Sequence, residues 1–465
     1  IQGFSSPNCL HSRALVWQSR RKRPVLMEGQ QQFLPQSNAR ELGSGQKPVC
    51  TFVQCVLDVV TILALLVLAP VLLVVFLLVC TIPTIERLFH PCRQYMDGVS
   101  SAYINHIIEG VIHGMVVSKE RKDAESVFQE FDKNYVTTTR PEFARFKQRV
   151  VRRNWLWPYW TDAADSFDPK HHFRPVREPL TKVGLEQRLA KIQTEMMDLD
   201  RPLWELWHFE NYTDEDGKAS SVTMLRIHHA CVDGFTGMRV VMQGAEPNKP
   251  PATVAQSRAD RRPRLGCLQL VSFAVRSVRK LLLMPDDSPS TFKASQRLSP
   301  TDARTVAWNT LKSATVADLK NVGKELNGAT INDILITALA GALRKYTQNA
   351  PNAGLSSDVT ACTWVSLSPL KHIYTDFDEL PLRWGNSTLG AVYMKLPVGP
   401  EHGQLSTEET MGVLRQSTSD PALMVEAGMA TRLLSLMGWV PRLICKPFWA
   451  SLANKVSVSM SNVPG

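Results

Sequence analysis

Apolar and polar residues alternate along residues 221–227, which is the period of a β-strand with one buried face. Residues 235–242 follow after a glycine and can coil into a helix. The junction between them reads Ile227-His228-His229-Ala230-Cys231-Val232-Asp233-Gly234. The pattern therefore predicts two imidazoles at the end of a strand, ahead of a turn and a helix.

The same periods predict elements elsewhere in the chain. Gly328 is expected to stop one helix, and Thr330 with Asp333 forms a capping-box pattern that opens the next. The expected helical stretches are 122–131, 316–326, the stretch from 330 onward and 424–454, and the expected strands begin after 202 and cover 359–367, 389–396 and 456–460. Strands mixed with helices in this way indicate an α/β protein.

The longest apolar run covers residues 59–82, where 24 consecutive residues carry no charge. A helix needs about 20 such residues to cross a bilayer, so the pattern predicts a transmembrane segment within 53–82. Pro70 would kink it. Arg40 and Lys47 before the run balance Arg87 and Arg93 after it, so flanking charge does not fix the orientation. Residues 1–52 are expected to be a disordered tail.

Residues 155–160 are rich in tryptophan, which fits either core packing or an aromatic belt at a membrane interface. Residues 244–301 are basic and rich in Pro, Ser and Gln, as in a linker between two lobes. Within that linker, residues 265–284 form an apolar and basic stretch of helical length. It fits a helix lying on an anionic membrane surface or one packed between the lobes.

The composition of the chain limits the kinds of molecule that it is expected to bind. Its 465 residues allow two or three domains, and a formal net charge of +10 favours anionic partners. The positive charge gathers beside apolar segments and not in a nucleic-acid-binding module, which disfavours a nucleic-acid role. Nine cysteines without a CxxC pair indicate reduced thiols.

The His-His pair is the best candidate for chemistry. A histidine titrates near neutral pH, so an imidazole at a strand end can accept a proton from a hydroxyl and later return it. Asp233, with Gly234 behind it, is close enough to brace the turn that aims the ring. Two alternatives remain: the pair caps the strand without chemistry, or Cys231 acts as a nucleophile instead of as a small buried residue. A zinc site is disfavoured, because no third ligand stands at ligand spacing.

The HHxxxDG pattern of the pair resembles the motif of the coenzyme A-dependent acyltransferase superfamily. Five further motifs follow the order seen in the wax ester synthase/diacylglycerol acyltransferase family. They are Phe167-Asp168-Pro169-Lys170-His171-His172, Asp200-Arg201-Pro202-Leu203-Trp204-Glu205, Gly328-Ala329-Thr330-Ile331-Asn332-Asp333, Gly385-Asn386 and Ser461-Asn462-Val463-Pro464-Gly465. The resemblance covers roughly residues 110–465.

The resemblance implies transfer of a fatty acyl group from acyl-CoA to a long-chain alcohol or diacylglycerol, without a metal or redox cofactor. It implies that His229 is the general base and that His228 and Asp233 fix the turn, Asp233 through an arginine that the sequence does not identify. Gly234 would allow close backbone approach. Supporting or substrate-lining roles fall on Pro202, Leu203, Trp204, Asn332, Asp333 and Asn386, although helix capping alone is the favoured explanation of Asn332 and Asp333.

The implied fold is a two-lobed chloramphenicol acetyltransferase-like α/β fold with a central tunnel. Its lobes would be residues 100–243 and 302–465. Members of the family generally continue beyond the position of Gly465, and the given sequence does not start with methionine. We therefore expect the sequence to be a fragment of a longer chain. Because acyl-CoA is cytosolic, the catalytic part is expected to face the cytosol from a membrane, which we expect to be that of the endoplasmic reticulum, with the plasma membrane or a lipid droplet as alternatives. The rival hypothesis is a membrane-tethered acyl-CoA- and lipid-binding protein without turnover.

Overall fold

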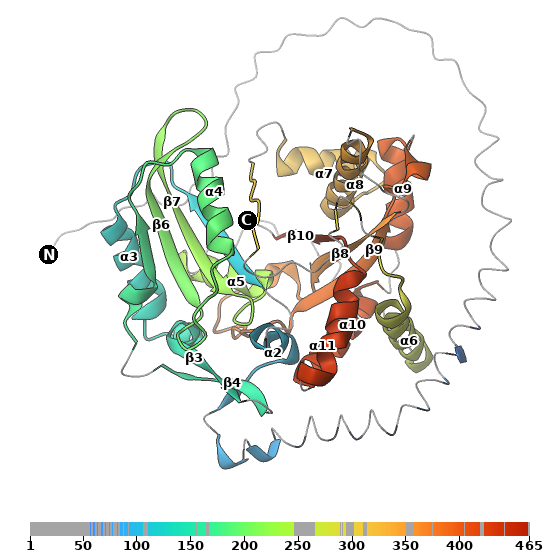
Figure 1. The fold of residues 1–465 in the computed structure, drawn as a ribbon, viewed down its shortest axis with the longest axis horizontal. Coiled ribbons are helices and arrows are strands. Elements are labelled where there is room, and N and C mark those ends of the chain that lie inside the picture. The colour runs from blue at the N-terminus through green and yellow to red at the C-terminus, as the bar shows by residue number, and fades with distance from the viewer. Residues whose placement is uncertain are drawn as a thin grey trace, which may run out of the picture. The chain divides into compact units, whose positions relative to one another are not determined.

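All the elements described below lie within Asp58–Gly465. The computed structural model describes single positions between 56 and 81 and the following stretches: 84–86, 88–91, 93–105, 110–153, 156–163, 167–245, 266–288, 290, 292–293, 302–309, 314–349, 358–373, 375–403, 405–418, 423–440 and 442–463. Figure 1 shows the helices and strands in these stretches.

Within the described residues, no helix combines the length and the apolar character needed to cross a membrane. The predicted span at 53–82 lies for the most part outside the described residues, as do the predicted tail 1–52 and much of the linker 244–301. The transmembrane helix therefore has no support from the described part of the chain.

The first sheet has four strands in the order β2-β7-β6-β5. They are β2 (Val111–Val117), β7 (Ala219–His228), β6 (Trp204–Thr213) and β5 (Phe173–Val176). β7 is antiparallel to both of its neighbours, whereas β5 runs parallel to β6. Two helices, α4 (Lys182–Gln193) and α3 (Ala124–Phe131), bury apolar side chains against this sheet.

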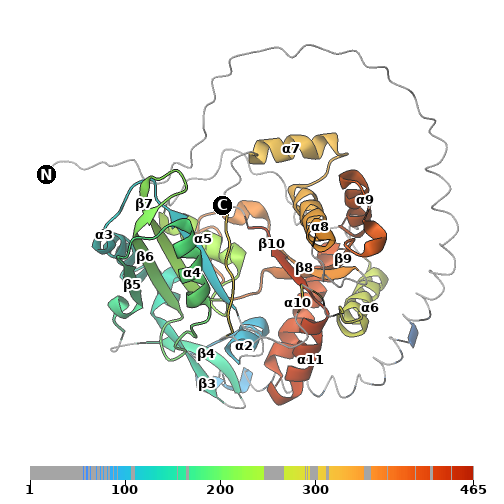
Figure 2. The ribbon, with the colours of Figure 1, turned by 45° about the horizontal axis from the view of Figure 1, so that its top comes forward.

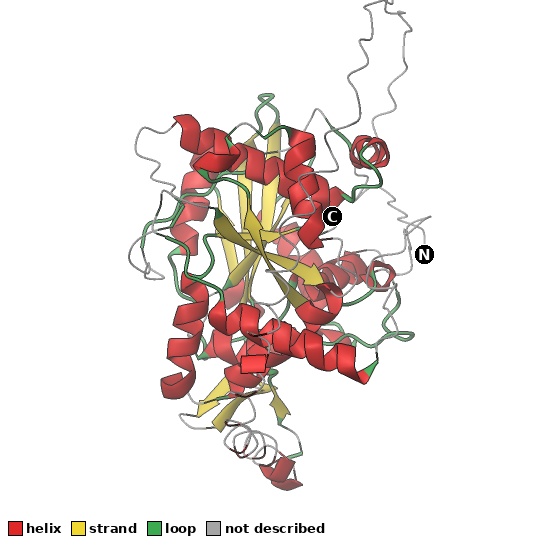
Figure 3. Cartoon of the chain, turned by 90° about the vertical axis from the view of Figure 1, so that its right-hand side faces the viewer, coloured by secondary structure: helices red, strands yellow, loops and turns green. Residues whose placement is uncertain are grey.

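The second sheet has three strands, β10 (Val458–Ser461), β8 (Val359–Ser366) and β9 (Leu389–Leu396), in that order. Figures 1 and 3 show the helices that accompany it: α6 (Cys267–Leu283), α7 (Val316–Glu325), α8 (Ile331–Asn349), α9 (Thr407–Thr418), α10 (Leu423–Trp439) and α11 (Arg442–Asn454). These bounds confirm the predicted helices and strands of the second half to within a few residues. The chain is therefore a mixed α/β protein.

A third, smaller sheet joins β1 (Gln94–Tyr95), β4 (Leu156–Asp162) and β3 (Gln148–Arg153). In β4, Tyr159 and Trp160 are buried, and Trp157 stacks on Trp439 with ring centroids 4.6 Å apart. For these described residues, the tryptophan-rich segment serves core packing, the first of its two predicted roles.

The apolar core continues from the first half of the chain into the second. One cluster contains Trp204 and Ile227 from the first sheet together with Leu434 and Trp449 from α10 and α11. The helix α2 (Gly98–Ile104) crosses α10 so closely that a Cβ on Gly98 would collide with the backbone of Ser435. The ends of both sheets are thereby fixed relative to each other.

The helix predicted at 265–284 is α6, and it packs on α10. Ser277 Oγ donates to the Glu426 carbonyl oxygen at 3.2 Å, and Lys280 and Arg276 form ion pairs with the Glu426 carboxylate at 2.6 and 3.0 Å. The helix therefore lies against protein, but these partners all belong to the second half of the chain, so its predicted position between the lobes is not confirmed.

A buried carboxylate ties the loop after α6 to β8, to β9 and to the residue that precedes β10. Asp287 accepts hydrogen bonds from the Thr360 amide at 2.6 Å and the Thr360 hydroxyl at 2.7 Å. The Ser457 hydroxyl donates to it at 2.7 Å, and the Lys395 ammonium lies 2.8 Å from it. These hydrogen bonds hold the pKa of Asp287 below its usual value, although burial acts in the opposite direction.

Candidate active site at the His-His turn

The strand β7 ends at His228, as the hydrophobic pattern predicts, and α5 (Gly234–Ala245) begins at the predicted glycine. The strand end is held on both sides. His228 donates its backbone N–H to the Leu203 carbonyl at 3.0 Å, and His229 donates to the Gly110 carbonyl at 3.0 Å. The two imidazoles therefore leave the sheet from a fixed backbone.

A loop from the second half of the chain clamps the turn. Gly385 donates its N–H to the Cys231 carbonyl at 2.7 Å, and its own carbonyl accepts from the Asp233 N–H at 3.2 Å. Gly385 has a φ of 102°, and a Cβ there would collide with the Asp97 carboxylate. Only glycine fits this position without strain.

Asn386 occupies the centre of the clamp and is completely buried. Its side-chain amide donates to the His229 carbonyl at 2.8 Å and to the Ser100 hydroxyl at 3.0 Å. Its backbone N–H donates to Asp97 at 3.1 Å, and Asp97 also accepts from Ser100 at the start of α2. Asn386 thus connects the second half of the chain to the backbone of the predicted base.

The ring of His229 stacks on Tyr103, with centroids 4.6 Å apart and an interplanar angle of 8°. Burial lowers the pKa of His229, while its own backbone carbonyl, the charge of Asp233, the Asn386 amide and the charge of Asp97 raise it. Burial is the largest of these influences, so the ring is neutral at neutral pH. A neutral imidazole can accept a proton, as a general base requires.

Asp233 is fully buried and caps α5. It accepts the Thr236 N–H at 2.7 Å and a short hydrogen bond from the Thr388 hydroxyl. Burial raises its pKa, and the hydrogen bonds from Thr388 and Thr236 oppose that rise. The expectation that an arginine pairs with Asp233 is wrong for the described residues, where a helix N-terminus and a hydroxyl take that place.

The ring of His228 lies edge-on to Tyr103, with centroids 6.5 Å apart, and His229 stacks on the same tyrosine. Nδ1 of His228 accepts the Ala230 N–H at 3.1 Å, which supports the predicted role of this histidine in fixing the turn. His228 also lines a cavity of about 370 Å³ together with Tyr103, Gly110, Val111 and His113. Tyr103 therefore connects the two histidines: it lines the cavity together with His228, and its ring stacks on the ring of His229.

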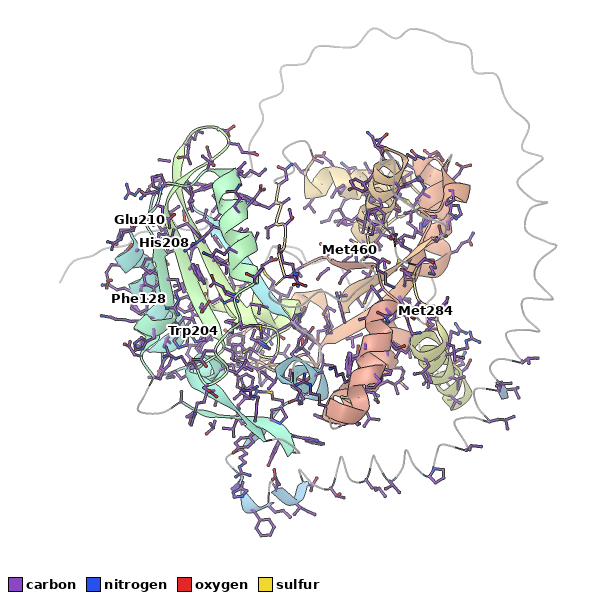
Figure 4. All side chains as sticks on the ribbon, in the orientation of Figure 1. Phe128, Trp204, His208, Glu210, Met284 and Met460 are labelled. Atoms are coloured by element: carbon purple, nitrogen blue, oxygen red, sulfur yellow. The ribbon has the colours of Figure 1, made fainter. Side chains whose placement is uncertain are left out.

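Pro202, Leu203 and Trp204 are buried, and none of the three lines this cavity. Trp204 stacks on His172 at 4.6 Å and donates its indole N–H to the Phe146 carbonyl at 2.8 Å (Figure 4). Their predicted role in lining a substrate tunnel therefore stays a prediction. The three residues support the strand end from the core.

Asn332 and Asp333 lie at the start of α8. Asp333 accepts from the Thr330 N–H at 2.8 Å, and Thr418 donates to it at 3.0 Å, so the capping explanation holds for Asp333. Asn332 is exposed and accepts from the Asn462 amide at 2.7 Å. Neither residue contacts His229 in the described hydrogen bonds, which leaves them outside the immediate site.

Gly234 faces the end of the chain. A Cβ placed on it would lie 3.0 Å from Val463 Cγ2, so the predicted close approach involves a side chain and not a backbone. Cys231 is buried, and burial raises the pKa of its thiol to about 12. A thiol in this state is a poor nucleophile, which favours the buried-residue interpretation.

Sequence reasoning missed Tyr103, Thr388, Asp97 and Ser100. The Asp97-x-x-Ser100 spacing is a helix N-cap pattern and could have located the start of α2. No local signal indicates that Tyr103 or Thr388 reaches the His-His turn, because both approach it only through tertiary contacts.

The model of the wax ester synthase/diacylglycerol acyltransferase catalytic domain matches residues 103–335, half of the chain. The chain belongs to this family. The match begins at Tyr103, the residue stacked on His229, and includes the whole His-His turn.

Two curated relatives carry names of the same kind. A Mycobacterium tuberculosis protein named "Putative diacyglycerol O-acyltransferase" is 32% identical over 232 residues, which are 44% of this chain and 44% of that protein. The O-acyltransferase WSD of Acinetobacter baylyi is 28% identical over 219 residues, 40% of this chain and 45% of that protein. The matched region thus spans less than half the length of these relatives.

Among solved structures, the wax ester synthase/diacylglycerol acyltransferase from Marinobacter aquaeolei VT8 is 17% identical, with a TM-score of 0.47 over 80% of this chain and 82% of that chain.

Proposed function

We propose that this chain transfers a fatty acyl group from acyl-CoA to the hydroxyl of a long-chain alcohol or a diacylglycerol. The observation that carries the proposal is the neutral, buried imidazole of His229, clamped at a strand end inside the HHxxxDG motif. The names of the relatives agree with this chemistry.

In the proposed reaction, His229 accepts the proton of the acceptor hydroxyl as the hydroxyl oxygen attacks the thioester carbonyl. The tetrahedral intermediate collapses, the carbon–sulfur bond breaks, and the coenzyme A sulfur takes the proton back from His229. General base catalysis supplies on the order of 10²–10⁴ in rate, and alignment of the two substrates supplies the rest. His228 and Asp233 hold the turn, and Tyr103 and Asn386 fix the ring and its backbone.

For the fold, we propose the two-lobed chloramphenicol acetyltransferase-like arrangement with a tunnel between the lobes. The clamp by Gly385 and Asn386 supports it, because this clamp places a loop of the second half directly over the turn of the first. Both substrates would meet at His229 from opposite openings of that tunnel.

We also propose that residues 59–82 hold the protein at a membrane, with the catalytic part on the cytosolic side at the endoplasmic reticulum. The acceptors dissolve in membranes and acyl-CoA in the cytosol, so an enzyme at this boundary reaches both. Extraction with alkaline carbonate, compared between the chain and a variant without residues 59–82, tests this. Release of both into the soluble fraction would contradict the proposal.

The activity is tested with the complete chain and labelled palmitoyl-CoA, offered with hexadecanol and dioleoylglycerol side by side. Labelled ester that disappears in His229→Ala, while the variant keeps the melting temperature of the wild type, supports the proposal and identifies the acceptor. If wild type and His229→Ala both form no product yet both bind palmitoyl-CoA, the protein is a lipid-binding protein and the proposal fails.

A further inference from the structure

The cavity beside His228 is built on one face of the first sheet. In the antiparallel register Val111 pairs with His228, and His113 pairs with Arg226. Paired residues, and residues two apart on a strand, share a face. His113 therefore points to the same face as His228, and both line the cavity of about 370 Å³. Cavities that bind small ligands are typically about 300–1,000 Å³.

The half-buried His113 differs from His208, another histidine of the first sheet, in its hydrogen bonds. His208 has both ring nitrogens bonded, to Thr223 Oγ1 at 3.0 Å and to the Lys122 carbonyl at 2.9 Å (Figure 4). Nε2 of His113, by contrast, is buried and has no hydrogen-bond partner among the described residues. Burial lowers the pKa of His113 to about 4, and the charge of Arg226 acts in the same direction against that of Glu205, so the ring is neutral.

An unsatisfied buried polar atom costs stability and contributes nothing to the fold. Replacement of His113 by an apolar residue of similar size should therefore leave the fold intact. Nε2 has almost no accessible surface in this ring position, so a ligand in the cavity supplies the missing partner once the ring turns this nitrogen toward it. A neutral imidazole that carries its proton on Nε2 donates to a carbonyl oxygen.

Arg304, from the segment 302–309, also lines the cavity. The residues of this segment alternate between half-buried and exposed, and Asp302, Arg304, Val306 and Trp308 are the half-buried ones. Val306 and Trp308 pack on the apolar cluster between α4 and the first sheet. The backbone N–H of Trp308 donates to the Glu186 carboxylate at 3.2 Å. Figures 1 and 2 show the segment beside α4. It holds Arg304 at the cavity.

We propose that this cavity takes the ester-bearing glycerol part of a diacylglycerol and that His113 binds one of its ester carbonyls. The inference rests on the proposed acyl transfer. Diacylglycerol carries two ester carbonyls beside its free hydroxyl, whereas a long-chain alcohol carries none. A hydrogen-bond donor in the cavity next to the His-His turn therefore distinguishes the two acceptors.

The lining favours the lipid acceptor over coenzyme A. Arg304 is its sole Lys or Arg side chain among the described residues, and Glu195 lies in the same lining, whereas the phosphates of coenzyme A need a cationic surface. Met196, Met197 and Leu199 supply the apolar surface that acyl chains require. Gln193 and Arg304 add further polar groups to the lining, and a few placed polar groups beside apolar side chains are the usual way in which a site fixes the orientation of its ligand.

The test compares kcat/KM for dioleoylglycerol and for hexadecanol, each measured with saturating palmitoyl-CoA. The variants are His113→Leu, His113→Gln, which retains a side-chain N–H, and His208→Leu as the control for loss of a buried histidine. One hydrogen bond to an uncharged partner corresponds to a factor of about 2–10. We expect the ratio of dioleoylglycerol to hexadecanol to fall about fivefold in His113→Leu and to recover in His113→Gln.

In the same experiment, His113→Leu should keep the melting temperature and the KM for palmitoyl-CoA, whereas His208→Leu should melt lower with an unchanged acceptor ratio. An unchanged ratio in His113→Leu, or a raised KM for palmitoyl-CoA, would overturn the inference. If the wild type transfers to neither acceptor, the proposed function fails by itself. Binding of labelled dioleoylglycerol then decides the inference: weaker binding by His113→Leu supports it, and equal binding refutes it.

Discussion

Two substitutions of Asp233 distinguish its structural role in the His-His turn from its electrostatic effect on His229. Asp233→Asn keeps an oxygen for the Thr236 N–H, and the Thr388 hydroxyl can rotate to accept from the new amide. It removes the negative charge that raises the pKa of His229. Asp233→Ala removes the helix cap and both hydrogen bonds as well.

The magnitudes follow from these contacts. Loss of an N-cap costs about 0.5–2 kcal/mol, and an unsatisfied buried group about 1–3 kcal/mol. Because burial raises the pKa of Asp233, its ionised form is disfavoured in the folded state, and this destabilisation grows as the pH rises through the folded pKa. Asp233→Ala removes the carboxylate, so the variant is free of the destabilisation that ionisation of Asp233 causes. We therefore expect Asp233→Ala to lose about 2 kcal/mol at neutral pH, and Asp233→Asn to be at least as stable as the wild type.

The effect on activity has a defined sign. A protonated His229 cannot act as a base, so kcat/KM falls as the pH drops through the pKa of His229, which lies below the usual histidine value. Without the charge of Asp233 this pKa drops further, and the acidic limb of the profile moves to lower pH. Misplacement of the turn in Asp233→Ala should cost about 10²-fold in kcat/KM.

Thermal melting and a pH profile of kcat/KM with labelled palmitoyl-CoA measure both effects for the two variants. The reasoning is refuted if Asp233→Asn melts lower than Asp233→Ala, or if its acidic limb moves to higher pH. A full loss of activity in the asparagine variant at all pH values would also contradict it, because the geometry of the turn is retained.

Three further outcomes are expected. Asn386→Ala leaves the buried carbonyl of His229 without its donor, so it should lose about 1–3 kcal/mol of stability and more than tenfold in kcat/KM, and equal activity would refute the clamp. Asp287→Ala should lower the free energy of unfolding by about 1–3 kcal/mol, measured by denaturant titration, because the Thr360 and Ser457 donors lose their acceptor while the half-exposed Lys395 ammonium stays in contact with water; the wild type should also lose stability as the pH falls below the usual aspartate pKa. Cys231→Ala should keep kcat within about threefold and show no burst of product, since an acyl-enzyme on this buried thiol is not expected; a loss like that of His229→Ala would contradict direct transfer.

The sequence by itself determined the local elements and the position of the motif. The alternation of residues 221–227 and the glycine at 234 locate the end of β7 and the start of α5, because side-chain period and backbone freedom are local properties. The Thr330 and Asp333 pair locates the start of α8 for the same reason. Family membership also follows from the order of short motifs along the chain.

The surroundings of the two histidines depend on tertiary contacts. Tyr103, Asn386 and Thr388 reach the turn from segments more than 100 residues away, and no periodicity of β7 encodes those contacts. The family resemblance implied an arginine as the partner of Asp233, yet a helix N-terminus and a hydroxyl can satisfy a carboxylate equally well. The unpartnered nitrogen of His113 likewise becomes visible only when the register places it at the cavity, since hydrogen-bond satisfaction is a property of the packed chain.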